Sequence, residues 1–152
     1  MRTVVQRVRS ASVAVGGEVV ASVGTGLLAL VGIEVDDGRA DAEWTADKLA
    51  HLRIFEDGAG KMNLSVLDVR GSLLLVPNFT LAGDAAKGRR PGFDRAMRPE
   101  QAGPLFEVLA GLAAGLGVPV SRGVFRAEMA VSLVNDGPVT LVLQSPRATE
   151  GG

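Results

Sequence analysis

The sequence predicts an α+β fold in which mixed and antiparallel sheets curl into a barrel-like core with two main helices. Strand-like segments open and close the chain, and two helical segments are separated by strands. The length of 152 residues suits one domain. No repeat, linker or change of composition divides the chain. We therefore expect a single domain over residues 1–146 and a flexible polar tail over residues 147–152.

Short runs rich in Val and Leu indicate the strands in the first half of the chain. They are residues 3–8, 12–15, 18–23, 27–35 and 72–76. Gly16 and Gly17 separate the second run from the third by the two residues that a tight hairpin needs. The fourth and fifth runs are continuously apolar, which is typical of strands buried on both faces.

Residues 39–52 predict the first helix, with an N-cap supplied by the segment Asp36-Asp37-Gly38. The residues that share one face of it are Ala42, Ala46, Leu49 and Arg53, with Trp44 and Leu52 beside them. Residues 53–55 then look extended, and Gly-rich residues 56–60 predict a loop.

The second helix is predicted to begin at Pro99, since proline suits the first helical turn, and to end before Gly117. Its packed face is expected to carry Leu105, Leu109, Leu112 and Leu116, which follow helical spacing. Pro119 places the short strand 118–120 near the edge of a sheet. Residues 123–125 then predict a turn that leads into the last strands.

Two apolar runs near the C-terminus, residues 130–134 and 139–143, flank Asn135-Asp136-Gly137-Pro138. All four intervening residues favour turns, so an ordinary strand–turn–strand fits the segment. The bond before a proline can also be cis. The carbonyls around a cis Gly137–Pro138 bond can point the same way, forming a rigid acceptor pair without any side chain.

Composition excludes several classes of site. The absence of Cys excludes disulfides and thiolate catalysis, and a single His51 excludes multi-His metal sites, so we expect no metal and no cofactor. A net charge of −1 predicts no general attraction to polyanions. No signal peptide or apolar run long enough to cross a bilayer is present, so we expect a cytoplasmic protein without a membrane partner.

The best candidate for chemistry lies where the buried strand 72–76 ends. A strand end leaves backbone N–H groups free at Phe79, Thr80 and Leu81, which could form an oxyanion hole. The Thr80 hydroxyl could instead act as a nucleophile, which would need a base such as Lys61 or Asp84, or it could simply bond its own backbone.

The loop 82–93 that follows carries the dense basic cluster of the chain, which consists of Lys87, Arg89 and Arg90. A loop of this length in a small domain is either functional or mobile. These side chains are therefore candidates for phosphate contacts, although ordinary solvated charges fit them as well. Since such contacts would be few, any RNA binding should depend only shallowly on salt.

Segments spread from Met1 to about Gln144 resemble the D-aminoacyl-tRNA deacylase family. They are Gln6-Arg7-Val8 with residues 11–13, residues 26–32, residues 53–55, residues 60–63, Phe79-Thr80-Leu81, the pattern Gly88-x-Arg90-Pro91-x-Phe93, and residues 131–140. The most specific segment is Asn-Asp-Gly-Pro-Val-Thr, which starts at Asn135.

The resemblance implies a homodimer of barrel-like subunits that hydrolyses D-aminoacyl-tRNA at a site on the dimer interface. It implies a cis bond at Gly137–Pro138, whose carbonyls reject L-amino acids but admit glycine, including glycine mischarged on tRNA-Ala. Backbone N–H groups around Phe79 and Thr80 would receive the substrate carbonyl or the adenosine. The 2′-OH of the terminal adenosine would activate the attacking water.

The resemblance also assigns roles to further side chains. Those assigned to the substrate pocket are Pro77, Asn78, Leu81, Phe125 and Met129, and those assigned to support of the Gly-Pro segment are Gln6, Arg7 and Asn135.

One departure from the family matters, because Pro77-Asn78 replaces the usual Ser-Gln. An animal relative that edits L-Ala also carries Pro there. The change leaves room for altered handling of glycine or small L-residues. Two alternatives also stay open: an esterase with Thr80 as nucleophile, and a binder of RNA 3′ ends without turnover.

Overall fold

The computed structural model describes residues 1–147, so the predicted tail lies outside the described residues except for Arg147. The strands are β1 (Arg2–Val15), β2 (Glu18–Val23), β3 (Gly26–Gly32), β4 (Phe55–Glu56), β5 (Met62–Leu64), β6 (Ser72–Pro77), β7 (Val120–Arg122) and β8 (Ala130–Gln144). The helices are α1 (Arg39–His51), α2 (Pro99–Gly115) and a short 3-10 helix, η1 (Phe79–Ala82). No helix in the described part is long and apolar enough to span a membrane.

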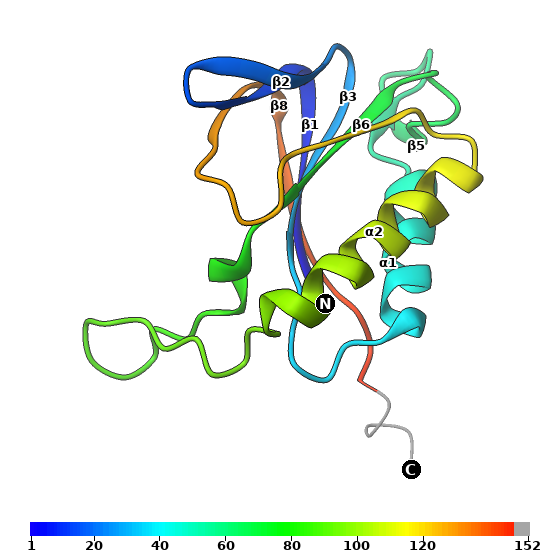
Figure 1. The fold of residues 1–152 in the computed structure, drawn as a ribbon. Coiled ribbons are helices and arrows are strands. Elements are labelled where there is room, and N and C mark those ends of the chain that lie inside the picture. Colours follow the sequence, from blue (N-terminus) through cyan, green and yellow to red (C-terminus); the bar gives the residue numbers. More distant parts are fainter. Residues whose placement is uncertain (148–152) are drawn as a thin grey trace.

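A mixed sheet runs in the order β2-β1-β3-β6-β7, and β8 pairs with the other side of β1. β1 is antiparallel to β2, β3 and β8, whereas β3–β6 and β6–β7 are parallel. β2 also approaches β6 and β7, because the sheet curls back on itself (Figure 1). The predicted α+β fold with a barrel-like sheet and two main helices is confirmed.

Helices α1 and α2 lie against each other on one side of the sheet (Figure 1). β6 supplies Leu73 and Leu75 to the core beneath them, while Leu74 and Val76 enter a second apolar cluster on the opposite face. This alternation follows from the two-residue period of a strand. Both faces of β3 and β6 are therefore buried, as their continuous apolar runs predict.

The predicted packing face of α2 is partly wrong. The helix buries Ala102, Phe106, Leu109, Ala110 and Ala113, whereas Leu116 is exposed. Leu105 and Leu112 lie at the border of the core. The buried face of α1 is also rich in alanine, and small side chains let two helices approach closely. Close packing between the helices thus selects a face that leucine spacing alone does not identify.

The strand–turn–strand interpretation of the C-terminal segment is also wrong, because β8 continues through it without reversing. Both halves of β8 run antiparallel to β1, with Gln6 opposite Thr140 and Val8 opposite Asn135. Residues 136–139 bulge out between these two pairs. The turn-forming residues are used to build a wide bulge, since β1 offers an uninterrupted partner on both sides of it.

Smaller differences concern strand and helix ends. Segments 3–8 and 12–15 belong to one strand, β1, and the hairpin at Gly16 and Gly17 forms with positive φ at both glycines. The N-cap of α1 does come from the predicted segment 36–38, at Gly38, whose N–H donates to Asp41 Oδ2. The strand expected at 118–120 is β7, which starts at Val120 and lies at the end of the strand order.

Candidate functional site

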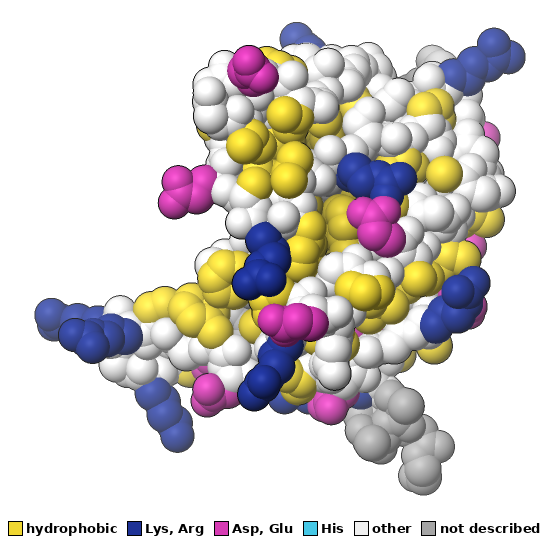
Figure 2. Space-filling model, in the orientation of Figure 1, with side chains coloured by type: hydrophobic (Ala, Val, Ile, Leu, Met, Phe, Trp, Pro, Cys, Tyr) yellow, Lys and Arg dark blue, Asp and Glu magenta, His cyan; other side chains and the backbone are white. Residues whose placement is uncertain are grey.

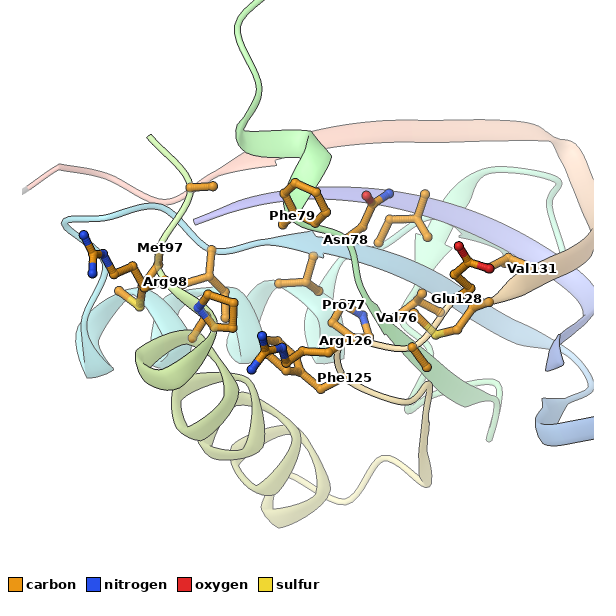
Figure 3. A pocket seen from close by; sticks show the side chains of 18 residues that line it. Val76, Pro77, Asn78, Phe79, Met97, Arg98, Phe125, Arg126, Glu128 and Val131 are labelled. Atoms are coloured by element: carbon orange, nitrogen blue, oxygen red, sulfur yellow. The ribbon is translucent and has the colours of Figure 1, made fainter. Parts of the chain in front are cut away.

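A cavity of about 660 Å³ opens where the ends of β3 and β6, the start of α2 and the loop 123–129 meet (Figure 3). In the space-filling view, hydrophobic side chains line the hollow in the middle of the molecule (Figure 2). Apolar groups such as Val31, Val76 and Ala102 form most of its wall. A mostly apolar cavity with a few polar groups is the usual form of a small-molecule site.

Four of the five residues assigned to the substrate pocket line this cavity together with Phe79, and they come from two segments far apart in the chain. β6 and the turn after it supply Pro77 and Asn78 as well as Phe79, and the loop 123–129 supplies Phe125 and Met129. The loop is tied to the sheet by a hydrogen bond from Gly123 N to Leu75 O, 2.8 Å long. A Cβ on Gly123 would lie 2.7 Å from Met129 Sδ, so glycine permits this close approach.

The backbone at the end of β6 presents two unused donors. Asn78 N–H donates to Val31 O at 2.8 Å, and Leu81 N–H donates to Asn78 O at 3.3 Å. Within residues 1–147, the N–H groups of Phe79 and Thr80 have no acceptor. The expectation of free donors is therefore wrong for Leu81, because the chain turns into η1 and uses that group locally.

Thr80 lies outside the cavity lining, with its hydroxyl donating to Asn78 Oδ1 at 2.6 Å. An amide oxygen cannot serve as a general base. Neither Lys61 nor Asp84 hydrogen-bonds the hydroxyl in the described structure. Leu81 also lies outside the lining and packs instead against Gly32, where an added Cβ would lie 2.7 Å from its Cβ.

The bulge of β8 is a separate constellation, and its Gly137–Pro138 bond is cis. Gly137 has a φ of +146°, and a Cβ there would lie 2.8 Å from Val139 N, so no larger residue fits without a shift. Gly137 and Pro138 are both exposed, and neither lines the cavity of its own chain.

Side chains from two strands hold this bulge. Buried Arg7 donates from Nε to Asp136 O at 2.8 Å and from Nη1 to Ile54 O at 2.7 Å. Asn135 accepts from Val139 N–H at 2.8 Å and donates to Val139 O at 3.1 Å. Gln6 contributes only a longer contact, 3.4 Å from its amide nitrogen to Thr140 Oγ1.

Three charged residues at the cavity were missed by sequence reasoning: Arg98, Arg126 and Glu128. Figure 3 shows Arg98 at the start of α2, and Arg126 and Glu128 on the loop opposite. Arg126 adopts a positive φ of 68°, which is uncommon for a residue with a side chain. No sequence signal marks it, because nothing in its neighbours indicates that conformation.

The remaining candidates lie elsewhere. Lys87, Arg89 and Arg90 are exposed on a loop beyond η1 and do not line the cavity. His51 is exposed on α1, with Nε2 3.7 Å from an Asp47 carboxylate oxygen. Residues 1–147 contain no group of three or more His, Asp or Glu side chains placed to hold a metal ion.

A buried polar network supports the cavity wall from behind. Buried Glu34 pairs in an antiparallel bridge with Ala96, which lines the cavity, and accepts a hydrogen bond from Gln144 at 2.7 Å. Arg95 Nε lies 3.3 Å from the carboxylate of Glu34. Burial works to raise the pKa of Glu34, but the Gln144 hydrogen bond and the nearby positive charges outweigh it and lower that pKa.

Asp37 in the same network behaves oppositely. It accepts hydrogen bonds from the Met1 ammonium at 2.6 Å and from Glu34 N–H at 2.7 Å. Burial nevertheless raises the pKa of its carboxyl above the ordinary value. As pH falls, the contribution of Glu34 to the free energy of unfolding therefore decreases, whereas that of Asp37 increases.

Comparison with known sequences gives a consistent result. The family model described as D-Tyr-tRNA(Tyr) deacylase matches residues 4–144. A protein of Geotalea uraniireducens is 53% identical over 152 residues, covering 100% of this chain and 98% of its own length. One of Anaeromyxobacter dehalogenans is 58% identical over 147 residues, covering 97% and 99%. Both are named D-aminoacyl-tRNA deacylase.

Two solved structures resemble the fold. A structure named c-Myc DNA Unwinding Element Binding Protein has a TM-score of 0.92 at 40% identity, covering 97% of this chain and 100% of its own. A probable eukaryotic D-amino acid tRNA deacylase has a TM-score of 0.80 at 15% identity, covering 93% and 97%. The second likeness shows the shared fold alone.

Proposed function

The chain belongs to the D-Tyr-tRNA(Tyr) deacylase family and is a hydrolase, and from this premise we propose that it cleaves the ester between a D-amino acid and the 3′ end of tRNA. One observation carries the proposal. The cavity brings Pro77, Asn78 and Phe79 beside Phe125 and Met129, and the N–H groups of Phe79, which lines it, and of the adjoining Thr80 are unpaired. Because aminoacyl-tRNA is made and used in the cytoplasm, we place the reaction there.

In this proposal, the N–H groups of Phe79 and Thr80 bind the ester carbonyl. Negative charge develops on that oxygen as water attacks, and fixed backbone donors stabilise it without reorganising. The apolar walls formed by Phe125 and Met129 hold the terminal adenosine. A volume of about 660 Å³ lies within the usual range for small-molecule sites.

In this proposal, the carbonyl groups around Gly137–Pro138 enter the cavity of a partner subunit and exclude L-amino acids from it. Two observations support a dimer with shared sites. The bulge is exposed and lies outside its own cavity. β8 is an edge strand that exposes Val134, Leu141 and Val142, and a long apolar edge is a surface that proteins normally cover.

Water is activated by the 2′-OH of the terminal adenosine. The water oxygen attacks the ester carbonyl carbon while one of its protons passes, by way of the 2′-OH, to O3′. The bond from that carbon to O3′ breaks, and the free D-amino acid and a tRNA with a 3′-OH are released. The chain supports this assignment because it has no Cys, its single His51 is exposed on α1, and Thr80 bonds an amide. The reaction then needs no metal.

Glycine carries no side chain for the carbonyls to reject, so we propose that glycine mischarged on tRNA-Ala is also cleaved. Pro77 and Asn78 form the cavity wall where the family usually has Ser-Gln. Proline removes a hydroxyl and a backbone donor from that wall. We therefore expect any difference in specificity from the family to concern tRNA esters of small L-amino acids.

The test is deacylation of D-Tyr-tRNA, L-Tyr-tRNA and Gly-tRNA-Ala by the purified protein, with and without EDTA. We expect cleavage of the D-Tyr and glycyl esters, spared L-Tyr-tRNA and no effect of EDTA. Equal cleavage of both tyrosyl esters would overturn the chiral filter. Tight binding of D-Tyr-tRNA without turnover would instead support the binder of RNA 3′ ends.

A further inference from the structure

A closed arm projects from the molecule just beyond the cavity. Its residues, 84–92, are joined at the base by two reciprocal hydrogen bonds, from Asp84 N to Gly92 O and from Gly92 N to Asp84 O, both 2.8 Å long. In Figure 1 the arm is the green loop that extends away from η1. Its attachment at both ends fixes the direction in which it leaves the domain.

The arm carries positive charge without local compensation. Lys87, Arg89 and Arg90 are exposed, and no carboxylate of residues 1–147 lies within 4.0 Å of their charged nitrogens. The carboxylate of Asp84 accepts a hydrogen bond from Ala86 N–H at 2.9 Å instead. Figure 2 shows Lys and Arg side chains at this end and hydrophobic ones between it and the hollow.

Two exposed aromatic rings join the arm to the cavity. Phe93 follows the base of the arm and packs edge-on against Phe79, with ring centroids 5.3 Å apart. Phe79 is 62% exposed and Phe93 38%, whereas Phe55 and Phe106 are buried. Gly83 lies beneath Phe93, and a Cβ there would come within 2.8 Å of the ring. Phe79 also lines the cavity.

We propose that the arm and the Phe79–Phe93 pair bind the unpaired nucleotides that precede the terminal adenosine of tRNA. One base stacks on the exposed rings, and the neighbouring phosphates pair with Lys87, Arg89 and Arg90. Exposed aromatic rings beside unpaired cations form the usual site for single-stranded nucleic acid. The proposal rests on the proposed function, because an adenosine in the cavity places the preceding nucleotide at its mouth.

Two substrates separate this inference from the proposed function. D-Tyr-tRNA carries the preceding nucleotides, whereas 3′-O-D-tyrosyl-adenosine lacks them. With Phe93→Leu, which keeps an apolar contact on Phe79 but removes the stacking surface, we expect kcat/KM for D-Tyr-tRNA to fall about tenfold. Hydrolysis of the adenosine ester should stay within about twofold, since the cavity is unchanged. Phe93→Tyr keeps an aromatic ring and should retain the activity on tRNA.

The charges of the arm are tested by replacing Lys87, Arg89 and Arg90 together with Gln. A matched variant replaces Arg39, Lys48 and Arg70, which are exposed elsewhere, so that both proteins lose the same net charge. For uncharged tRNA, we expect a log–log salt slope shallower than about −5 in the parent chain. The arm variant should flatten that slope by about 2, and the matched variant should leave it unchanged.

The outcomes distinguish the two ideas. Equal losses on both substrates with Phe93→Leu would show that the ring only holds η1 in place, and would overturn the inference. An unchanged salt slope in the arm variant would overturn it as well. If the parent chain cleaves neither substrate, the proposed function fails, while binding of uncharged tRNA by the same variants still decides whether the arm contacts RNA.

Discussion

Arg7 is a buried cation whose guanidinium joins the bulge of β8 to the segment after α1. It reaches Asp136 O and Ile54 O at once, at 2.8 and 2.7 Å. A guanidinium can make two such bonds in a fixed fork, whereas a lysine ammonium is a single point donor on a flexible stem. The position of Gly137 and Pro138 therefore depends on arginine at this site.

We expect Arg7→Lys to lower the free energy of unfolding by about 2 kcal/mol, because a buried carbonyl loses its donor. Deacylation of D-Tyr-tRNA should fall at least about tenfold, since about 1.4 kcal/mol of lost positioning energy corresponds to that factor. Arg9→Lys is the matched control, because exposed Arg9 contacts only the Asp136 carboxylate. If both variants behave like the parent chain in urea unfolding and deacylation, Arg7 does not position the bulge.

The Thr80 hydroxyl tests the alternative in which the protein forms a covalent intermediate. Its one side-chain hydrogen bond goes to Asn78 Oδ1 at 2.6 Å and is exposed. We expect Thr80→Ala to retain deacylase activity within about fivefold, the effect of one lost hydrogen bond of about 1 kcal/mol. Loss of a true nucleophile would cost on the order of a millionfold. Single-turnover assays with D-Tyr-tRNA separate the two.

At the scale of elements, Glu34 links three parts of the chain that the sequence keeps far apart. It follows β3, accepts from Gln144 at the end of β8, and contacts Arg95 before α2. Since Ala96 pairs with Glu34 and lines the cavity, this network also fixes the wall of the candidate site. Its stability should depend on pH, because its carboxylates have shifted pKa values.

The pKa of Glu34 is lowered from its usual 4.5, so its stabilisation is present above that pH and is lost as pH falls through the lowered value. We expect Glu34→Gln to cost about 2 kcal/mol at pH 7 and progressively less in acid. Asp37→Asn is the comparison, because the raised pKa of Asp37 makes the parent chain gain relative stability as pH falls. Urea unfolding at neutral and acidic pH measures the free-energy cost of each substitution. The same pH trend in the two variants would contradict the opposite pKa shifts of Glu34 and Asp37.

At the scale of the whole molecule, the exposed edge of β8 supports the proposed dimer with shared sites. Val142 is 67% exposed on this strand, and Val19 is 66% exposed on β2. A lysine at an interface loses its hydration without gaining a partner, which disfavours association. The two positions therefore provide a matched pair for locating the interface.

We expect the parent chain to have the mass of two subunits by light scattering. Val142→Lys should shift it to the mass of one and abolish deacylation, because each cavity then lacks the partner's Gly137–Pro138 segment. Val19→Lys should remain dimeric and active. A fully active monomeric Val142→Lys protein would contradict a site shared between subunits.

The sequence by itself determined the elements that depend on neighbouring residues. Gly16 and Gly17 specify the first hairpin, Pro99 the start of α2, and the apolar runs the two strands buried on both faces. Family motifs also pointed to Pro77, Asn78 and Phe79, which the structure places in the cavity. Each of these signals is local, since turn geometry, capping and side-chain period act over a few residues.

Only the tertiary structure decided the features that depend on distant partners. The segment at Asn135 continues as a bulged strand because β1 pairs on both sides of it. α2 buries Phe106 and alanines rather than Leu116 because α1 lies close beside it. Phe79 and Arg126 meet at one cavity because the loop 123–129 returns to the end of β6. Such contacts join residues far apart in the chain, so packing decides them and local pattern does not.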